Sequence, residues 1–208
     1  MKNYLVIDDH EIVRSSVKTI LQELFNPCHV DEAANEEMAR AKLKEQKYNL
    51  VIMDIIMPDT DPIRLTEYIK TFFPSCPVLI FSMNPENIYA KRFFKAGAMG
   101  YISKNSELSD LKKAIELVLN QRKYISPHLA ELLAGEMSNE SAKNPFDKLS
   151  SREFEVANLL VSGKNLTEVS DLLCISVSTT GTHKSRLFEK LGVKNILELA
   201  EIKKAYAD

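Results

Sequence analysis

Two short apolar runs, each ending in a carboxylate, constrain the fold of this chain more than any other feature. Tyr4–Ile7 leads directly into Asp8 and Asp9, and Leu50–Met53 leads into Asp54. Short apolar runs bounded by polar residues are typical of strands that are buried on both faces of a parallel sheet. The carboxyl ends of such strands meet at one edge of the sheet, where open α/β folds bind their ligands. The sequence therefore predicts that the three acids share one site.

Three neighbouring carboxylates repel one another unless a cation lies between them. Their oxygens are hard ligands, of the kind that Mg²⁺ prefers. We therefore expect a Mg²⁺-assisted site for phosphate chemistry at this edge, with Asp8, Asp9 and Asp54 as its acidic side chains.

The alternation of strand-like and helix-like segments predicts an α/β fold for the first part of the chain. Further strands are expected at Val30–Ala34, Pro77–Ser82 and Met99–Ser103, and each strand precedes apolar residues at helical spacing. Five such repeats imply a (βα)₅ doubly wound parallel sheet, flavodoxin-like in its order of elements. This domain is expected to cover residues 1–121.

The rest of the chain divides into a linker and an all-α domain. Residues 122–147 are rich in polar residues, Pro and Gly and are expected to be a linker, with a short helix at His128–Met137. Residues 148–208 offer no strand candidate. Four helices are expected there: Ser151–Ser162, Leu166–Leu173, Val177–Leu191 and Ile196–Ala205.

Composition excludes little. The chain has 208 residues, of which 45% are hydrophobic and 27% charged, with a formal net charge of −2. These values are typical of soluble globular proteins and predict no diffuse attraction to nucleic acid or to membranes. No apolar stretch reaches the roughly 20 residues that a membrane span requires, so we expect a cytoplasmic protein without a membrane partner.

Two more strand ends add polar side chains to the predicted edge, since Ser82 ends the fourth strand and Lys104 follows the fifth. A nucleophilic carboxylate, a hydroxyl and an ammonium beside a metal are the groups that an incoming phosphoryl group requires. The ordered set Asp8-Asp9, Asp54, Ser82 and Lys104 resembles the receiver domain of two-component response regulators. The resemblance covers essentially all of residues 1–121.

This resemblance implies that Asp54 accepts a phosphoryl group. It implies that Asp8, Asp9 and Asp54 bind Mg²⁺ together with the backbone carbonyl of Ile56. Met57-Pro58 also matches the family pattern.

The resemblance further implies that Lys104 pairs with the phosphate and that Ser82 and Tyr101 form a hydroxyl–aromatic switch. In that switch the phosphate draws Ser82 inward, and Tyr101 then fills the vacated space. One departure concerns the loop Asp59-Thr60-Asp61-Pro62, which lacks the glycine that the family usually has there. Because Pro62 suits the first turn of a helix, this loop is expected to be built differently.

The C-terminal helices resemble the LuxR/FixJ-type helix-turn-helix over residues 148–205. The matching residues include Leu149, Glu153, Gly163, Glu168, Val169, Ser176, Thr179, Thr182, His183 and Lys190-Leu191-Gly192-Val193. The resemblance implies that the helix starting near Val177 enters the major groove of DNA. Basic and acidic residues nearly balance in this domain, so charge alone supports DNA binding only mildly.

The predicted recognition helix has an inward face of Thr180, His183, Leu187 and Leu191. The expected DNA-binding residues are Thr179, Gly181, Thr182, Lys184, Ser185, Arg186 and Lys190. By the resemblance, Gly181 takes a base-facing position where the family often has Lys or a larger residue. Bidentate reading of guanine is unavailable from glycine, so the sequence predicts weaker affinity, or reading through methyl contacts and DNA shape.

The sequence is identified as a response regulator of the NarL-like class. A sensor histidine kinase is expected to phosphorylate Asp54 and thereby control sequence-specific binding to double-stranded DNA and transcription, with a homodimer as the phosphorylated or DNA-bound form. The protein is expected not to be an enzyme, apart from assisting its own phosphorylation and dephosphorylation. An alternative is a phosphorylation-independent regulator whose receiver is a dimerisation scaffold. An aspartyl-phosphate hydrolase is disfavoured, because Ile55 and Ile56 follow Asp54 where such enzymes need a second acid.

Overall fold

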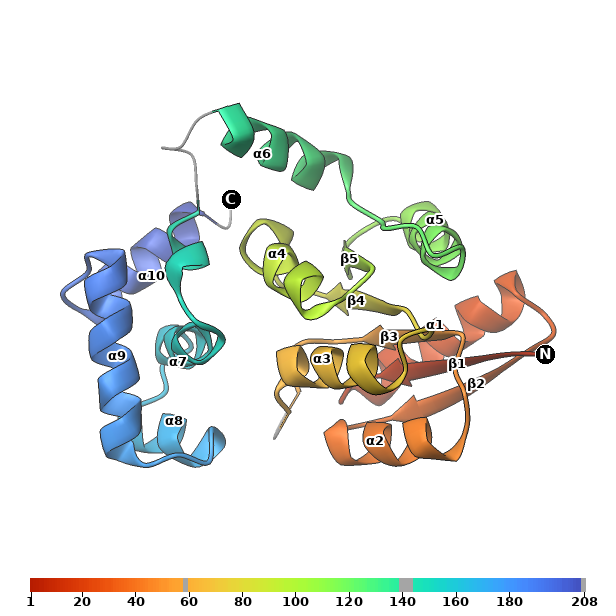
Figure 1. Ribbon diagram of the computed structural model, residues 1–208, viewed down its shortest axis with the longest axis horizontal. Coiled ribbons are helices and arrows are strands. Elements are labelled where there is room, and N and C mark those ends of the chain that lie inside the picture. The colour runs from red at the N-terminus through yellow and green to blue at the C-terminus, as the bar shows by residue number, and fades with distance from the viewer. Residues whose placement is uncertain (58–59, 139–143, 207–208) are drawn as a thin grey trace. The chain divides into compact units, whose positions relative to one another are not determined.

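The computed structural model describes residues 1–57, 60–138 and 144–206, and it divides into two compact units, Met1–Ala130 and Glu131–Asp208. The first unit is a parallel sheet flanked by helices, and helices are the only regular elements among the described residues of the second (Figure 1). The predicted fold class, a (βα)₅ sheet followed by an all-α domain, is confirmed.

The sheet has five strands in the order β2-β1-β3-β4-β5, and all neighbouring strands are parallel. The strands are β1 (Lys2–Ile7), β2 (Cys28–Ala33), β3 (Leu50–Met53), β4 (Val78–Ser82) and β5 (Gly100–Ser103). The strand order reverses direction between β1 and β3. In doubly wound sheets this switch point forms a crevice at the carboxyl ends of the strands.

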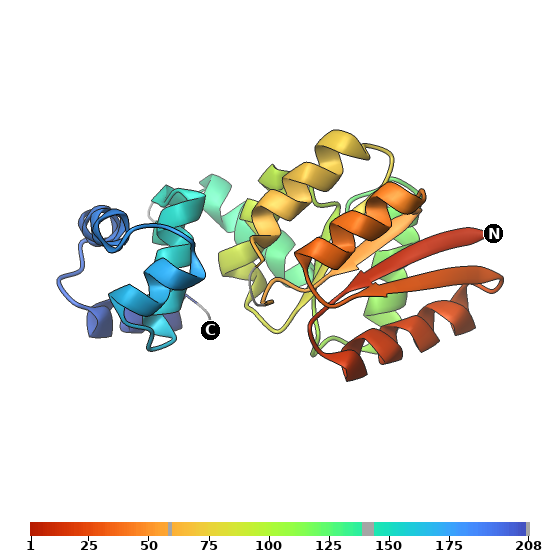
Figure 2. The same cartoon turned by 90° about the horizontal axis from the view of Figure 1, so that it is seen from below.

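Helices cover both faces of the sheet (Figure 2). The helices α1 (Glu11–Leu24) and α5 (Leu108–Leu119) cover one face, where Tyr4 and Val6 of β1 join their apolar residues in one core. The other face carries α2 (Glu36–Glu45) and α3 (Pro62–Phe72), with α4 (Glu86–Ala96) beside α3. Strand residues on both faces are buried, which explains why the strands are almost continuously apolar in sequence.

Local signals set several helix ends. Asp61 caps α3, accepting a hydrogen bond from the backbone N–H of Arg64 at 3.0 Å, and Pro62 occupies the first turn as expected. The helix α4 ends at Gly97, whose φ of 108° is a left-handed conformation that glycine adopts without strain.

The first part of the expected linker packs against the sheet. Tyr124 forms a parallel bridge with Gly100 of β5, and α6 (Pro127–Ser138) follows where a short helix was expected. The compact first unit extends to Ala130. Residues 139–143 of the predicted linker lie outside the described residues, and the domain limits at 121 and 147 stay predictions.

The second unit is built around a helix-turn-helix. Its elements are the short 3₁₀ helix η2 (Pro145–Lys148), α7 (Ser151–Val161), α8 (Leu166–Leu172), α9 (Val177–Leu191) and α10 (Ile196–Ala205). The helix α9 packs against α7 and α8, and Phe146, Phe154, Val169, Leu187 and Leu199 form buried parts of this unit. The sequence analysis missed only η2 among these elements.

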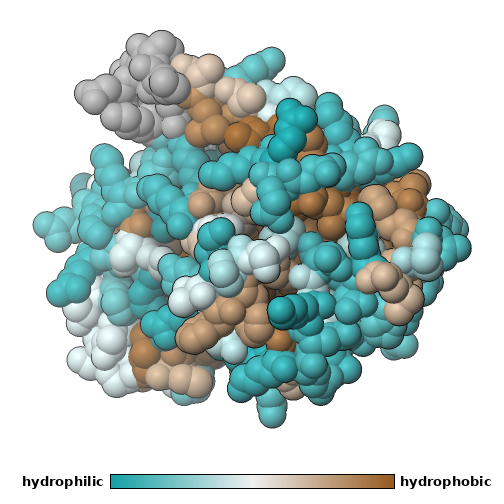
Figure 3. Space-filling view, turned by 45° about the vertical axis from the view of Figure 1, so that its right-hand side comes forward, coloured by the Kyte–Doolittle hydropathy of each residue, from teal (hydrophilic) through white to brown (hydrophobic). Residues whose placement is uncertain are grey.

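Hydrophilic side chains predominate on the face of the molecule in Figure 3, with smaller hydrophobic groups between them, as on most folded proteins. Among the described residues, no helix has both the length and the apolar character needed to cross a membrane.

Candidate functional site

Strand register brings the predicted acids together. Ile7 of β1 lies beside Met53 of β3, so that Asp8 and Asp54 leave the sheet at the same level. The backbone N–H of Asp54 donates to the carbonyl of Ile7 at 2.9 Å, which continues the ladder by one residue. Both acids are therefore placed by sheet hydrogen bonds rather than by a flexible loop.

The same register places the hydroxyl and the ammonium. Ser82 lies beside Ser103, and the backbone N–H of Lys104 donates to the carbonyl of Ser82 at 2.9 Å. The ends of β1, β3, β4 and β5 thus all contribute side chains to one edge of the sheet.

Lys104 joins two of the acids directly. Its Nζ lies 2.6 Å from Asp8 Oδ2 and 2.7 Å from Asp54 Oδ2. The exposed fractions of the three side chains are only 11%, 3% and 6%, in the order Lys104, Asp8 and Asp54. Burial acts to lower the pKa of Lys104, but the hydrogen bonds and charges of Asp54 and Asp8 outweigh it and raise this pKa above its ordinary value. Lys104 is therefore a fixed positive charge between two carboxylates.

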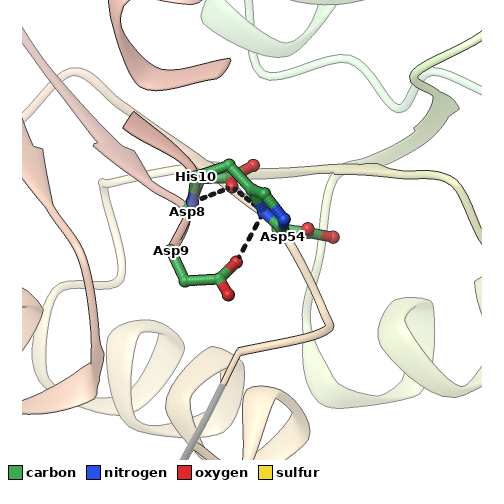
Figure 4. A group of neighbouring side chains, drawn as sticks. All are labelled: Asp8, Asp9, His10 and Asp54. Carbon is green, nitrogen blue, oxygen red and sulfur yellow. Dashed lines mark hydrogen bonds and ion pairs between the residues drawn. The ribbon is translucent and has the colours of Figure 1, made fainter. Parts of the chain in front are cut away.

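Asp9 completes the acidic group of Asp8, Asp9 and Asp54, and His10 lies beside these three carboxylates (Figure 4). Single ligand atoms of Asp8, Asp9, His10 and Asp54 all lie within 4.8 Å of one another. His10 Nδ1 is 2.8 Å from Asp9 Oδ1, close enough for an ion pair if the ring is protonated. This buried carboxylate oxygen has no hydrogen-bond donor in the part of the chain that the structure describes.

Ser82 and Tyr101 meet at a third residue, Asn84. The backbone N–H and the side-chain amide of Asn84 donate to Ser82 Oγ at 3.3 and 3.2 Å. The Tyr101 hydroxyl donates to the backbone carbonyl of Asn84 at 2.9 Å, and the Tyr101 side chain is fully buried. Burial raises the pKa of Tyr101 well above its ordinary value, so the phenol remains a donor at neutral pH.

The sequence analysis missed Asn84, which joins the two switch residues. Asn84 follows Ser82 by two positions, and its amide is the signal that could have drawn attention to it. Arg14 of α1 donates through Nη1 to the backbone carbonyl of Asp8 at 2.8 Å. By contrast, the side chain of the predicted ligand residue Ile56 is exposed in the loop after β3, and Met57 is buried. Pro58 and Asp59 lie outside the described residues.

The predicted DNA-binding residues all lie on α9, and their exposure differs. The side chains of Thr179, Thr182, Ser185, Arg186 and Lys190 are exposed, and Gly181 and Lys184 are partly exposed. Of the four predicted inward residues, Thr180 and Leu187 are fully buried, and His183 and Leu191 are partly exposed. Ser176 begins the helix and accepts from the backbone N–H of Thr179 at 3.0 Å, and Gly192 ends it with a φ of 70°.

Two of these residues have surroundings that the sequence did not reveal. Lys190 Nζ lies 2.6 Å from Glu153 Oε2 of α7, and this carboxylate is 4% exposed against 40% for the lysine. Lys190 is thus tied to the domain core at the same time as it faces outward. A Cβ added to Gly181 would meet no atom within 4 Å, so open space surrounds this glycine on the helix surface.

Comparison with known proteins assigns each of the two parts of the chain to a protein family. Residues 4–116 match the model of the response regulator receiver domain, and residues 147–202 match that of the bacterial regulatory proteins of the luxR family. The chain belongs to the two-component response regulators with a LuxR-type DNA-binding domain.

Relatives of this response regulator match over nearly their whole length. The response regulator GacA of Pseudomonas protegens is 33% identical over 199 residues, which cover 96% of this chain and 93% of the relative. RcsB from Salmonella enterica serovar Typhimurium, solved bound to the promoter rprA in the presence of the phosphomimetic BeF₃⁻, is 26% identical with a TM-score of 0.76 over 98% of both chains. A structure of two RcsB dimers bound to two parallel DNAs is 25% identical, with a TM-score of 0.62 over 98% of both chains.

These comparisons confirm the predicted family. The acidic group Asp8, Asp9 and Asp54 is typical of Mg²⁺ binding in a receiver domain. The matched families and relatives are regulators rather than enzymes.

Proposed function

We propose that a sensor histidine kinase phosphorylates this response regulator on Asp54, and that the phosphoryl group controls sequence-specific DNA binding by α9. The observation that carries the proposal is the buried contact of Lys104 with both Asp54 and Asp8 at the carboxyl edge of β1 and β3. A carboxylate beside a fixed ammonium, at the switch point of a doubly wound sheet, is placed to receive an anionic phosphoryl group.

The proposed transfer is a displacement at phosphorus. A carboxylate oxygen of Asp54 attacks the phosphorus of a phosphoimidazole, and the new O–P bond forms as the N–P bond breaks. The departing imidazole nitrogen takes up a proton from solvent. Lys104 Nζ, already within 2.7 Å of Asp54 Oδ2, neutralises the charge of the transferred phosphoryl oxygens.

The residues at this edge fit Mg²⁺. The carboxylates of Asp8, Asp9 and Asp54 supply hard oxygen ligands within 4.8 Å of one another, and the buried Asp9 Oδ1 has no hydrogen-bond donor among the described residues. The backbone carbonyl of Ile56 would complete the protein ligands. When bound, Mg²⁺ supplies positive charge for the phosphoryl oxygens and allows the three acids to remain ionised together.

The proposed switch residues are Ser82 and Tyr101. A phosphoryl group on Asp54 offers oxygens that accept a hydrogen bond from the Ser82 hydroxyl, and a turn of Ser82 toward them would draw its oxygen away from the two N–H groups of Asn84 that it now accepts from. Because Tyr101 also bonds to Asn84, a movement of Ser82 alters the surroundings of the phenol.

The proposed DNA contacts follow from α9. Exposed Thr182 and Ser185 are proposed to face base edges, together with the partly exposed Gly181 on the same side of the helix. Arg186 and Lys184 are proposed to contact phosphates, with Thr179 near the helix N-terminus. Lys190 is also proposed as a phosphate contact, although its ion pair with Glu153 already engages part of its charge. The DNA-bound dimers of RcsB support a homodimer on two half-sites.

The test is the intact mass of the protein after incubation with a small acyl phosphate, with and without Mg²⁺. We expect a phosphoryl adduct that requires Mg²⁺ and that is lost in the matched variant Asp54→Asn. DNA affinity is then measured for the phosphorylated and the unmodified protein against a pool of random duplexes.

Each outcome decides between functions. An adduct together with a change in DNA affinity supports the proposal. An adduct that remains in Asp54→Asn assigns the acceptor to another residue. DNA binding that is unaffected by phosphorylation would favour the alternative in which the receiver is a dimerisation scaffold.

A further inference from the structure

The segment between α5 and α6 is hydrogen-bonded to the start of β5, next to the predicted switch residue Tyr101. Tyr124 bridges to Gly100, and its backbone N–H donates to the carbonyl of Met99 at 2.9 Å. The packing there is close, since a Cβ at Gly100 would lie 3.1 Å from Tyr124 Cβ and 2.8 Å from Leu79 Cδ1. Glycine therefore allows this segment to lie directly against β5.

Two residues further on, Ser126 joins α6 to α4. Ser126 Oγ donates to Glu86 Oε1 in the first turn of α4 at 2.5 Å, and it accepts from the backbone N–H of Leu129 at 3.0 Å. The backbone carbonyl of Ser126 accepts from the N–H of Ala130 at 2.9 Å. Ser126 is therefore the capping residue of α6, and its hydroxyl proton is engaged by a carboxylate of another helix.

Glu86 lies only two residues after Asn84. Asn84 in turn holds Ser82 through two N–H groups and accepts from the Tyr101 hydroxyl. Pro85 connects the two residues with a φ of −60°, which its ring fixes. A short and partly rigid path thus leads from Ser82 through Asn84 and Glu86 to the cap of α6.

We propose that residues 124–129, named the strap here, carry the phosphorylation signal from Ser82 to the first turn of α6. The proposal rests on the proposed function at Asp54. When Ser82 turns toward a phosphoryl group, Asn84 loses the acceptor of its two N–H groups and moves. Pro85 passes this movement to Glu86, which withdraws its carboxylate from Ser126. The cap of α6 is then weakened, and the start of the helix opens more often.

The experiment is residue-resolved amide exchange of the full chain by NMR, with Mg²⁺ present and with beryllofluoride added or omitted. Loss of a helix cap changes the opening equilibrium by about tenfold, and we expect the amides of Leu129 and Ala130 to exchange about that much faster with beryllofluoride. Amides in the middle of α5 are the internal reference.

Variants test the path itself. In Glu86→Ala the amides of Leu129 and Ala130 exchange faster without beryllofluoride, and its addition has little further effect. The matched control is Glu107→Ala, because Glu107 stands at the start of α5 and also accepts from a serine, Ser109, at 3.3 Å. This control keeps the wild-type response.

A second variant covers the case in which Glu86→Ala disturbs α4. Ser126→Asp keeps an oxygen that caps α6 but cannot donate to Glu86 at neutral pH. We expect Ser126→Asp to lose the response to beryllofluoride. A full response in Ser126→Asp overturns the proposal.

The outcomes separate this inference from the proposed function. A Mg²⁺-dependent change at Asp54 and Ile55 with unaltered exchange at Leu129 and Ala130 overturns the strap alone. The absence of any change at the acidic group overturns the proposed function, and the strap with it.

Discussion

The acidic edge of the receiver and the exposed face of α9 are built in opposite ways. At the acidic edge, four strand ends bring together buried side chains whose charges are fixed by contacts at 2.6 and 2.7 Å. On α9 the candidate DNA contacts come from one continuous helix, and most of their side chains are exposed. Position is therefore set by the whole sheet in the first region and by a single helix in the second.

This difference determines what a substitution does. In a buried group of charges, the removal of one partner leaves another charge without compensation in a poorly solvated place. On an exposed helix, a side chain loses little interaction energy when its neighbour is replaced. The helix propensity of the substituted residue then has the larger effect on stability. The acidic edge should therefore respond strongly to single changes, whereas the surface of α9 should respond weakly.

The largest expected effect comes from Lys104→Met. Removal of the ammonium leaves Asp8 and Asp54 facing each other without a cation, and we expect the free energy of unfolding of the receiver to fall by roughly 3 kcal/mol at neutral pH. The measurement is hydrogen exchange of the slowest amides in β1 and β3. Addition of Mg²⁺ should restore part of the loss, because the cation again separates the carboxylates.

Lys112→Met is the matched control, because Lys112 is exposed on α5 and should tolerate the change. If the two variants had equal free energies of unfolding, the acidic edge would be no more sensitive to substitution than an ordinary surface, and the prediction would be wrong.

A smaller loss of stability is expected from breaking the ion pair between Lys190 of α9 and Glu153 of α7. Burial acts to raise the pKa of Glu153, but its bonds to Lys190 and Ser150 outweigh this and lower it below the ordinary value of 4.5. The stabilisation is therefore fully present above pH 4.5 and is lost as the pH falls through the lowered pKa. We expect Glu153→Gln to cost about 1.5 kcal/mol at pH 7 and much less in acid.

Urea unfolding followed by the NMR signals of α9 measures this at several pH values. Glu189→Gln, at an exposed position of α9, is the control and should leave the pH dependence unchanged. If the loss of stability in Glu153→Gln were the same at acidic and neutral pH, the ion pair would not be what stabilises the packing of α9 against α7.

The smallest effects are expected from two glycine substitutions that change the free energy of unfolding in opposite directions. Gly181→Ala should stabilise α9 by about 1 kcal/mol, because the added Cβ meets open space in a helix interior. Gly192→Ala should destabilise by about 1 kcal/mol, because its φ of 70° is strained for alanine. Thermal unfolding measures both, and a shift of the same sign for the two variants would contradict the account of α9.

Local patterns were sufficient for the strands and α-helices of this fold, but not for the short helix η2. Each predicted strand was found within a few residues, and α9 and α10 have the predicted bounds, because apolar periodicity and capping residues act over a few neighbouring positions. The polar residues at the strand ends were also predictable, since parallel strands bring their carboxyl ends to one edge.

The sequence by itself determined the two kinds of domain, the family, and the acids, the hydroxyl and the ammonium at the strand ends. Only the tertiary structure decided that Lys104 contacts both Asp8 and Asp54, that Lys190 is tied to Glu153, and that Ser126 joins α6 to α4. These contacts join residues between 37 and 96 positions apart. The packing of whole helices and strands decides which residues meet in these contacts. No spacing between neighbouring residues in the sequence indicates them.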